Sequence, residues 1–258
     1  MAKQFDRVTV TAHPSVAVLA FNQPEVMNAV SARMIAGAMA ALDFIQGEGV
    51  RAMVLTGTGK AFCAGANLAE VEPGLSAGDM LDRVYHPFLR RLRDFPVPVV
   101  TAVNGAAVGI GMSFALSGDL CLAARSAFFQ QGFAKLGLVP DGGSTWLLPR
   151  LIGMARAREL ALLNEKLPAE TALLWGLING VADDEKLPGD AIALATRLAE
   201  GPAALAMTRK LFWDSPGNGY EQQLAQEQAA QQQASGTEDF REGLAAFHAK
   251  RPPKFTGK

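Results

Sequence analysis

The sequence has no excess of charge of either sign. Its 258 residues include 24 Lys and Arg against 25 Asp and Glu, which gives a formal net charge of -1. Binding to a nucleic-acid backbone depends on basic residues that neutralise phosphates. We therefore expect neither DNA nor RNA as a partner.

Cysteine is also scarce. Cys63 and Cys121 lie far apart, and no histidine stands near either of them at the spacing of a zinc site. Neither a disulfide framework nor a structural zinc site is supported. Two unpaired thiols suit a reducing compartment, so we expect a cytoplasmic protein.

We expect neither a signal peptide nor a membrane-spanning segment. The opening residues, MAKQFDRVTV, carry charges where a signal peptide needs an apolar stretch. Residues 95–118 are uncharged, but Pro96, Pro98 and Asn104-Gly105 interrupt them. These interruptions favour a buried strand, a tight turn and a buried helix over one membrane-spanning helix.

Strand and helix patterns alternate in the first part of the chain. Residues 7–12 and 15–21 predict a β-hairpin, and Ser31 is placed to cap a helix that ends near Gly47, before a strand at 52–57. The same order recurs twice in looser form further along. This alternation predicts an α/β fold, and a hydrophobic content of 49% suffices for one large core.

Strand signals almost vanish after about residue 150, where proline and glycine punctuate successive helices. The Gln-rich stretch 221–234 suits a solvated helix or a partner surface, and its composition favours the solvated helix. The basic ending 248–258 suits a frayed tail or an anion-binding cap. Physical reasoning on its residues alone favours the tail.

Several catalytic patterns are absent. There is no GxSxG motif, and no Ser or Cys partner for the three histidines can be identified. The segment TGTGKAF lacks the spacing and hydroxyl residue of a P-loop, and GAAVGIG misses the GxGxxG spacing. Hydrolase triads and dinucleotide sites are therefore not indicated.

Three glycine-rich loops follow apolar strands: AFCAGANL (61–68), AVNGAAVGIGMS (102–113) and KLGLVPDGGSTWLLPR (135–150). Glycine lets backbone N–H groups approach a ligand closely, and loops at strand ends are common ligand sites in α/β folds. Any one of these glycines could serve only a tight turn. The three together favour a ligand site, in which two loops could form an oxyanion hole.

These three loops, in this order and spacing, resemble the enoyl-CoA hydratase/isomerase (crotonase) superfamily. The resemblance extends from NQPEVMNAV (22–30) to the terminal AKRPPKFTG. Within the superfamily, the third loop and the ending REGLAAFHAKRPPKFTGK look most like the ring-epoxide isomerases of phenylacetyl-CoA degradation. Those enzymes make an oxepin-CoA and can also shift double bonds in enoyl-CoA thioesters.

The resemblance implies a spiral of β-β-α repeats over 1–195 and a C-terminal helical region, 196–258, that packs on the core or on a neighbouring subunit. It implies an acyl-CoA substrate and a homotrimer or dimer of trimers. No metal or redox cofactor is implied, because coenzyme A enters as part of the substrate. The family's oxyanion hole maps onto the backbone N–H groups of Ala66 and Ile110, which would stabilise a thioester enolate.

The acid and base groups depart from the hydratase pattern. Family hydratases hold water between two glutamates, whose positions correspond here to Ser113 and Phe133. Neither side chain can replace a glutamate in acid–base catalysis. The resemblance instead places both residues, with Leu138, in the acyl pocket.

Asp141 is the carboxylate left in the matching loops. Pro-Asp-Gly is by itself a turn sequence, so the aspartate could merely cap its loop. An aspartate at this place resembles the catalytic acid/base of the isomerases. We expect Phe129, Phe133, Leu136 and Leu138 to form a dry pocket that raises the pKa of Asp141.

The same aspartate also resembles the nucleophile of 4-chlorobenzoyl-CoA dehalogenases. That chemistry needs a histidine to activate water, and His86 lies in roughly the right part of the chain. However, Phe133 stands where the dehalogenases have a tryptophan near the third loop. The isomerase hypothesis therefore ranks above the dehalogenase hypothesis. A histidine in DRVYHPFLRR is by default a helix-surface or capping residue.

Coenzyme A contacts are also carried over from the family. The adenine would lie near Ala64, Ala66, Asn67 and Leu68, and Lys250 and Arg251 would meet the phosphates. Gln23 and Val26 stand where basic residues are common in the family, so the phosphate contacts are fewer or shifted. Asn67 replaces a usual aspartate, a change without an evident consequence.

We therefore predict an acyl-CoA isomerase in which Asp141 moves a proton along the bound acyl group. Conversion of a ring epoxide to an oxepin is the specific version, and a shift of a 3-enoyl-CoA to a 2-enoyl-CoA is the generic one. The alternatives are an enoyl-CoA hydratase, a dehalogenase and a non-catalytic acyl-CoA binding protein.

Overall fold

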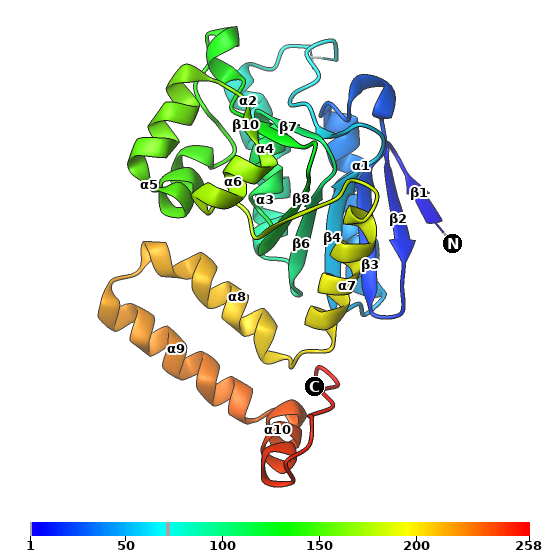
Figure 1. The fold of residues 1–258 in the computed structure, drawn as a ribbon, viewed down its shortest axis with the longest axis vertical. Coiled ribbons are helices and arrows are strands. Elements are labelled where there is room, and N and C mark those ends of the chain that lie inside the picture. The colour runs from blue at the N-terminus through cyan, green and yellow to red at the C-terminus, as the bar shows by residue number, and fades with distance from the viewer. Residues whose placement is uncertain (1, 71–72) are drawn as a thin grey trace.

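The computed structural model describes residues 2–70 and 73–258, which form two β-sheets wrapped by helices (Figure 1). The larger sheet has seven strands in the order β1-β2-β3-β4-β6-β8-β11. Its strands are β1 (Ala2–Phe5), β2 (Val8–Ala12), β3 (Val16–Phe21), β4 (Ala52–Gly57), β6 (Val99–Val103), β8 (Leu120–Ala124) and β11 (Gly180–Ala182). The first three pair antiparallel, and the pairs from β3 to β11 are parallel.

The smaller sheet has four strands in the order β10-β9-β7-β5. They are β10 (Leu167–Pro168), β9 (Phe128–Gln130), β7 (Ala106–Val108) and β5 (Ala61–Cys63). Each of the consecutive strand pairs β4/β5, β6/β7 and β8/β9 gives one strand to each sheet. The predicted spiral of β-β-α repeats is therefore confirmed.

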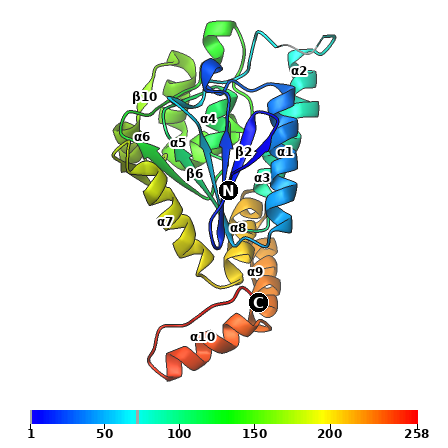
Figure 2. The same cartoon turned by 90° about the vertical axis from the view of Figure 1, so that its right-hand side faces the viewer.

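The described residues form ten α-helices. They are α1 (Ala32–Gly47), α2 (Ala77–Met80), α3 (His86–Arg93), α4 (Ile110–Ala115), α5 (Ser144–Leu163), α6 (Ala169–Trp175), α7 (Leu187–Ala199), α8 (Ala204–Asp214), α9 (Tyr220–Ser235) and α10 (Glu238–His248). Short turns form η1 (Pro24–Val26), the π-turn η2 (Leu81–Tyr85), η3 (Phe133–Leu136) and η4 (Ser215–Gly217). Figure 2 shows α1 and α7 on opposite sides of the sheet.

The helix α1 forms where the sequence predicted it. The Ser31 hydroxyl accepts a hydrogen bond from the Met34 N–H at 3.3 Å, which satisfies one of the free donors of the first turn. Apolar residues at helical spacing, including Leu42 and Ile45, are buried against the sheet. The capping residue and the apolar periodicity therefore indicate the same helix.

The uncharged stretch 95–118 contains β6, β7 and α4 instead of one long helix. All five residues of β6 are buried, as expected for a central parallel strand covered on both faces. Within the described ranges, no helix is long and apolar enough to cross a membrane.

Six strands were not predicted by their residue ranges: β1 at the N-terminal edge, β5, β7 and β9 in stretches expected to be loops or turns, and β10 and β11 in the part expected to be helical. The last two span only Leu167–Pro168 and Gly180–Ala182, which is too short for a recognisable alternation. They form because tertiary contacts place them beside β9 and β8. Edge strands of this length depend on their neighbours more than on their own propensity.

The C-terminal helices extend away from the sheets (Figure 1). The helix α7 still packs on β3, β4 and β6 and ends at Ala199, so the predicted boundary at 195 falls inside α7. The Gln-rich α9 buries no residue in the single chain, consistent with a solvated helix.

The last residues do not form a frayed tail, and that expectation is wrong. The buried carboxylate of Asp239 accepts hydrogen bonds from the N–H groups of Ala203, Thr256 and Gly257 at 2.7 to 2.9 Å. Arg51 also donates to the Phe255 carbonyl at 3.1 Å. Long-range partners of this kind could not be inferred from the composition of the tail.

A buried ion pair anchors α8 to the body of the protein. Arg209 Nε donates to Asp119 Oδ2 at 2.7 Å, and its other nitrogens donate to the carbonyls of Leu92, Arg93 and Phe95. Leu92 and Arg93 are the last residues of α3, whose final carbonyls have no partner within the helix. One guanidinium therefore holds α8 and the end of α3 together.

We expect Arg209→Met to lower the free energy of unfolding by about 3 kcal/mol, because it leaves a half-buried carboxylate without its charged partner and three carbonyls without their donor. Urea denaturation followed by circular dichroism measures the change. The matched control is Lys210→Ala, which removes an exposed partner of Asp214 and should cost under about 1 kcal/mol. Equal effects of the two variants would contradict the anchoring role.

Candidate active site

The three glycine-rich loops meet at one end of the smaller sheet. A β-carbon at Gly109 would lie 3.9 Å from the Gly65 Cα, and one at Gly65 would lie 3.2 Å from the Val108 carbonyl oxygen. A β-carbon at Gly142 would lie 2.5 Å from Ile110 Cδ1 and 2.7 Å from Ser113 Cβ. The structure thus brings the first, second and third loops into direct contact, as predicted.

The first predicted oxyanion donor, Ala66, is held by a short parallel bridge to Val30. Val30 N–H donates to the Gly65 carbonyl at 2.7 Å, and Asn67 N–H donates to the Val30 carbonyl at 2.8 Å. Because the flanking groups of the bridge face Val30, the Ala66 N–H points to the other side. That direction leaves it available to a ligand.

The second donor, Ile110, is the first residue of α4. N–H groups in the first turn of a helix have no partner within the helix, so this N–H is also available. Gly109 precedes it with a φ of 57°, a conformation that suits glycine. The two predicted donors therefore belong to loops in contact, and neither N–H is used by the bridge or the helix that contains it.

Glycine is required here by more than turn geometry. A β-carbon at Gly111 would lie 2.3 Å from the Cys63 carbonyl oxygen, and one at Gly105 would lie 2.1 Å from the Lys60 carbonyl oxygen. Both distances are far below van der Waals contact. The interpretation that each glycine serves only a tight turn therefore does not hold for Gly105 and Gly111, which also allow the close packing of the loops.

Asp141 belongs to the third loop and lies against the second. The Ser113 hydroxyl donates to the Asp141 main-chain carbonyl at 3.0 Å, which fastens the third loop to α4. The carboxyl oxygen Oδ1 is buried and has no hydrogen-bond partner among residues 2–70 and 73–258. Burial raises the pKa of Asp141 to about 6 because it disfavours the charged form.

The walls around this carboxyl differ in part from the prediction. Phe129 and Phe133 are buried, and Phe133 lies against Gly109. Leu136 and Leu138 are about half exposed, at 55% and 48%, so within one chain they do not enclose the aspartate. Ser113 is fully buried, where it supports the loop backbone.

Sequence reasoning missed Tyr85. It ends the π-turn η2 and is 5% exposed, with its ring edge-on to Phe114 of α4 at 6.5 Å between centroids. Burial and the nearby charges of Asp141 and Cys63 raise the pKa of Tyr85 to about 12. Its signal in the sequence is weak, because η2 belongs to a segment with no strong periodicity.

His86 begins α3 and lines a cavity of about 280 Å³ beside the third loop. Gly142 and Gly143, which follow Asp141, line the same cavity, together with the stacked rings of Trp146 and Trp213. The default expectation of a helix-surface histidine is therefore incomplete. His86 shares a cavity with the loop that carries the aspartate.

The predicted coenzyme A contacts fall into two groups. Ala64, Asn67 and Leu68 lie together in the first loop, and Asn67 Oδ1 accepts a hydrogen bond from the Ala69 N–H at 3.1 Å. Lys250 and Arg251 follow α10, which Figures 1 and 2 place at the end of the molecule opposite α4. A single chain therefore does not bring these two basic residues to the loops.

Arg251 is also engaged within its own chain. Its guanidinium donates to both carboxylate oxygens of Glu242, at 2.6 and 2.8 Å. This pair and the Lys254 N–H lower the pKa of Glu242 to about 2. A phosphate that used Arg251 would have to compete with this carboxylate.

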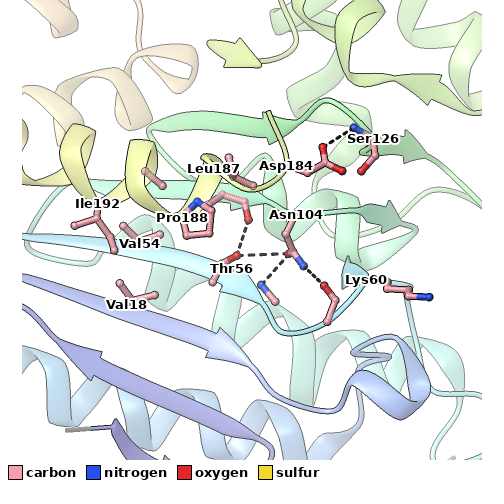
Figure 3. Close-up of a pocket in the computed structure, with 14 residues that line it drawn as sticks. Val18, Val54, Thr56, Lys60, Asn104, Ser126, Asp184, Leu187, Pro188 and Ile192 are labelled. Atoms are coloured by element: carbon pink, nitrogen blue, oxygen red, sulfur yellow. Dashed lines mark hydrogen bonds between the residues drawn. The ribbon is translucent and has the colours of Figure 1, made fainter. Parts of the chain in front are cut away.

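A larger cavity, of about 600 Å³, lies between α7 and the sheet (Figure 3). Its polar floor is satisfied internally: Asn104 accepts from the Gly57 N–H and donates to the carbonyls of Gly59 and Ala61. Thr56 donates to the Ala102 carbonyl at 2.8 Å. None of the predicted site residues lines it, so the catalytic candidates lie elsewhere.

Metal ligands do not gather anywhere in the part of the chain that the structure describes, where no group of three or more His, Cys, Asp or Glu is placed to hold an ion. The arrangement consists of two backbone donors, one desolvated carboxyl and a buried phenol. Such a set can stabilise an oxyanion and move a proton beside it.

The family profile described as enoyl-CoA hydratase/isomerase matches residues 11–258. The chain belongs to the enoyl-CoA hydratase/isomerase family. A Rhodobacter capsulatus protein named probable enoyl-CoA hydratase is 46% identical, over 94% of this chain and 95% of its own length. The Escherichia coli 1,2-epoxyphenylacetyl-CoA isomerase is 44% identical, over 94% of this chain and 95% of its own length.

Solved structures of this enoyl-CoA hydratase/isomerase family share the fold. A putative enoyl-CoA hydratase/isomerase from Mycobacterium abscessus has a TM-score of 0.91 and 35% identity, and the match covers 97% of this chain and all of that one (100%). Membership and fold are thus supported by both sequence and structure. The enoyl-CoA hydratase/isomerase family accounts for the arrangement of the glycine-rich loops.

We expect Gly111→Ala to lower kcat/KM about a hundredfold, because a β-carbon against the Cys63 carbonyl must displace the loop that carries the Ile110 N–H. The measurement is turnover of an enoyl-CoA thioester. Gly189→Ala in α7 is the control, since a β-carbon there meets nothing within 4 Å. Full activity of Gly111→Ala would contradict the proposed role of the close contact.

Proposed function

We propose that this protein is an acyl-CoA isomerase with Asp141 as its acid/base group. The observation that carries the proposal is a desolvated carboxyl on a loop that contacts the loop of the Ile110 N–H, which in turn contacts the loop of the Ala66 N–H. The positions at which family hydratases hold two glutamates are Ser113 and Phe133 in this sequence. One carboxylate suffices to move a proton, whereas water addition by the family's usual route needs two.

In the proposed reaction, the thioester carbonyl accepts hydrogen bonds from the N–H groups of Ala66 and Ile110. The Asp141 carboxylate takes a proton from C2, and the electron pair forms an enolate whose charge rests on the thioester oxygen. Asp141 then returns the proton to another carbon of the conjugated system. A pKa of about 6 leaves the aspartate largely ionised at neutral pH and still able to hold the proton.

The specific version of this chemistry is the opening of a ring epoxide of phenylacetyl-CoA to an oxepin-CoA. Its support is the similarity to the Escherichia coli 1,2-epoxyphenylacetyl-CoA isomerase. The generic version is the shift of a 3-enoyl-CoA to a 2-enoyl-CoA. Both versions use the same base and the same oxyanion donors.

Three alternative functions can be distinguished from the isomerase by the experiments described below. The Rhodobacter capsulatus relative named probable enoyl-CoA hydratase favours hydration. The cavity shared by His86 and Gly142 favours a dehalogenase-type hydrolysis of an ester on Asp141. A protein that binds acyl-CoA without turnover would be a non-catalytic binding protein.

The assembly is proposed on similar grounds. We propose a cytoplasmic homotrimer or dimer of trimers, in which helices after the spiral core pack on a neighbouring subunit. Phe212 and Phe247 on α8 and α10 are 75% and 78% exposed, which is unusual for large apolar side chains in a chain that stays alone. Lys250 and Arg251 lie far from the glycine-rich loops of their own chain (Figures 1 and 2). In an assembly they would instead reach a coenzyme A bound to the loops of a neighbouring subunit.

We expect Asp141→Asn to lower isomerisation of trans-3-hexenoyl-CoA by about 10²–10⁴-fold while coenzyme A binding is retained, because the amide cannot accept the proton. Absorbance of the conjugated product measures the rate, and calorimetry measures binding. The control is Asp43→Asn on the exposed face of α1. Wild-type protein that hydrates crotonyl-CoA but does not shift the 3-enoyl double bond would refute the isomerase.

The pH dependence follows from the same carboxyl. Since the base must be ionised, kcat/KM for trans-3-hexenoyl-CoA should be constant above pH 7 and fall as the pH decreases through about 6. An ordinary exposed aspartate would give its inflection near pH 4. A profile that stays flat down to pH 4.5, in protein shown to remain folded, would contradict a desolvated base.

A further inference from the structure

A fully buried amide side chain, which the proposed reaction does not use, follows the end of β9. It belongs to Gln131, the residue directly after this strand. Burial of an amide costs free energy unless the group is hydrogen-bonded, so the partners of Gln131 indicate what it does. They are Met112 in the second glycine-rich loop and Ser144 in the third.

One of these bonds reaches the helix that begins with an oxyanion donor. Gln131 Nε2 donates to Met112 Sδ at 3.3 Å. Met112 lies two residues after Ile110 in α4, and its N–H donates to the Gly109 carbonyl at 3.0 Å. The main chain supports the same segment, because the Gly109 N–H donates to the Gln130 carbonyl at 3.0 Å. Residues 130 and 131 therefore hold the turn that contains the Ile110 N–H.

The other bond reaches the turn that carries the base. The Ser144 hydroxyl donates to Gln131 Oε1 at 3.3 Å, and Ser144 is itself fully buried at the start of α5. The Ser144 N–H donates to the Asp141 carbonyl at 3.0 Å, which closes the turn between these two residues. A movement of Ser144 would therefore displace Asp141.

We propose that Gln131 is a positioning residue that fixes the separation between the Ile110 N–H and the Asp141 carboxyl. This inference rests on the proposed function and deepens it. Enolate formation needs the thioester oxygen at the donor and the C2 proton at the base at the same time, and these substrate atoms are a fixed number of bonds apart. A misplacement of about 1 Å can cost about 10²-fold in rate, even when it arises away from the reacting atoms.

The test measures kcat and KM for trans-3-hexenoyl-CoA in wild type and Gln131→Met. The methionine keeps the volume of the side chain but gives the Ser144 hydroxyl no comparable acceptor. We expect kcat to fall about 10- to 30-fold, with KM within about twofold of wild type, because binding is retained while the geometry relaxes. The bond from the Ser113 hydroxyl to the Asp141 carbonyl remains and limits the displacement.

The matched control is Thr101→Val. Thr101 is also fully buried, and its hydroxyl donates to the carbonyl of Ala115, the last residue of α4, at 2.7 Å. This variant loses a buried hydrogen bond to the same helix, at the end away from Ile110, and should keep its kcat. An unchanged kcat in Gln131→Met, or an equal loss of kcat in both variants, would overturn the proposal.

A smaller change, Ser144→Ala, covers the case in which Gln131→Met does not fold. It removes the same bond from the other side, so kcat should fall about 5- to 10-fold with KM retained. Where both single variants fold, the double variant should be no slower than Gln131→Met alone, because the two residues share one bond. An unchanged kcat in Ser144→Ala, or single effects that multiply in the double variant, would contradict the positioning role.

The pH profile separates positioning from a change in the base itself. Burial raises the pKa of Asp141 to about 6, and a shift in position alone leaves that carboxyl buried. The inflection of kcat/KM should therefore stay near pH 6 in both variants while the plateau falls. An inflection moved toward pH 4 would overturn the proposal, because the residue would then act on the solvation of the base. If wild type does not convert trans-3-hexenoyl-CoA, the proposed function fails, which is distinct from an unchanged kcat in variants of an active enzyme.

Discussion

The close approach of three backbone segments is the constraint on which the site depends. The second loop can lie against the first only because positions 105 and 111 carry no side chain, with the carbonyls of Lys60 and Cys63 where a β-carbon would be. The same holds for Gly142 against Ser113. Packing at this distance keeps the loops that carry the Ala66 and Ile110 N–H groups in contact, whereas a β-carbon at any of these positions would separate the loops.

The fold then leaves one carboxyl poorly solvated. Two other aspartates that are buried or half-buried have partners: Asp119 accepts from Arg209 and from the Val99 N–H, and Asp239 accepts from three backbone groups. Asp141 has a buried oxygen without such a partner in the part of the chain that the structure describes, and burial raises its pKa to about 6. Burial of this carboxyl costs folding free energy because it destabilises the charged form. The same effect raises the pKa toward neutrality, which a base working near neutral pH requires.

Much of this arrangement could be predicted from the sequence, because its causes are local. Apolar strands and the Ser31 cap predicted an α/β fold with α1 in place, and the resemblance of the three glycine-rich loops to the family implied the β-β-α spiral. The strands β10 and β11, the folded-back C-terminus and the burial of Tyr85 depend on contacts between distant segments. The exposure of Leu138 could not be predicted either. The local sequence does not determine whether an apolar residue in a loop faces the pocket or the solvent.

The central claim is that Asp141 and the two backbone donors generate an enolate, and exchange of the C2 protons in D₂O tests it most directly. Hexanoyl-CoA has no double bond to move, so deuterium at C2 reports enolate formation alone. The account predicts deuterium incorporation in wild-type protein, measured by mass spectrometry, and none above the buffer rate in Asp141→Asn. Equal incorporation in both proteins, or none in wild type while 3-enoyl substrates are converted, would contradict it.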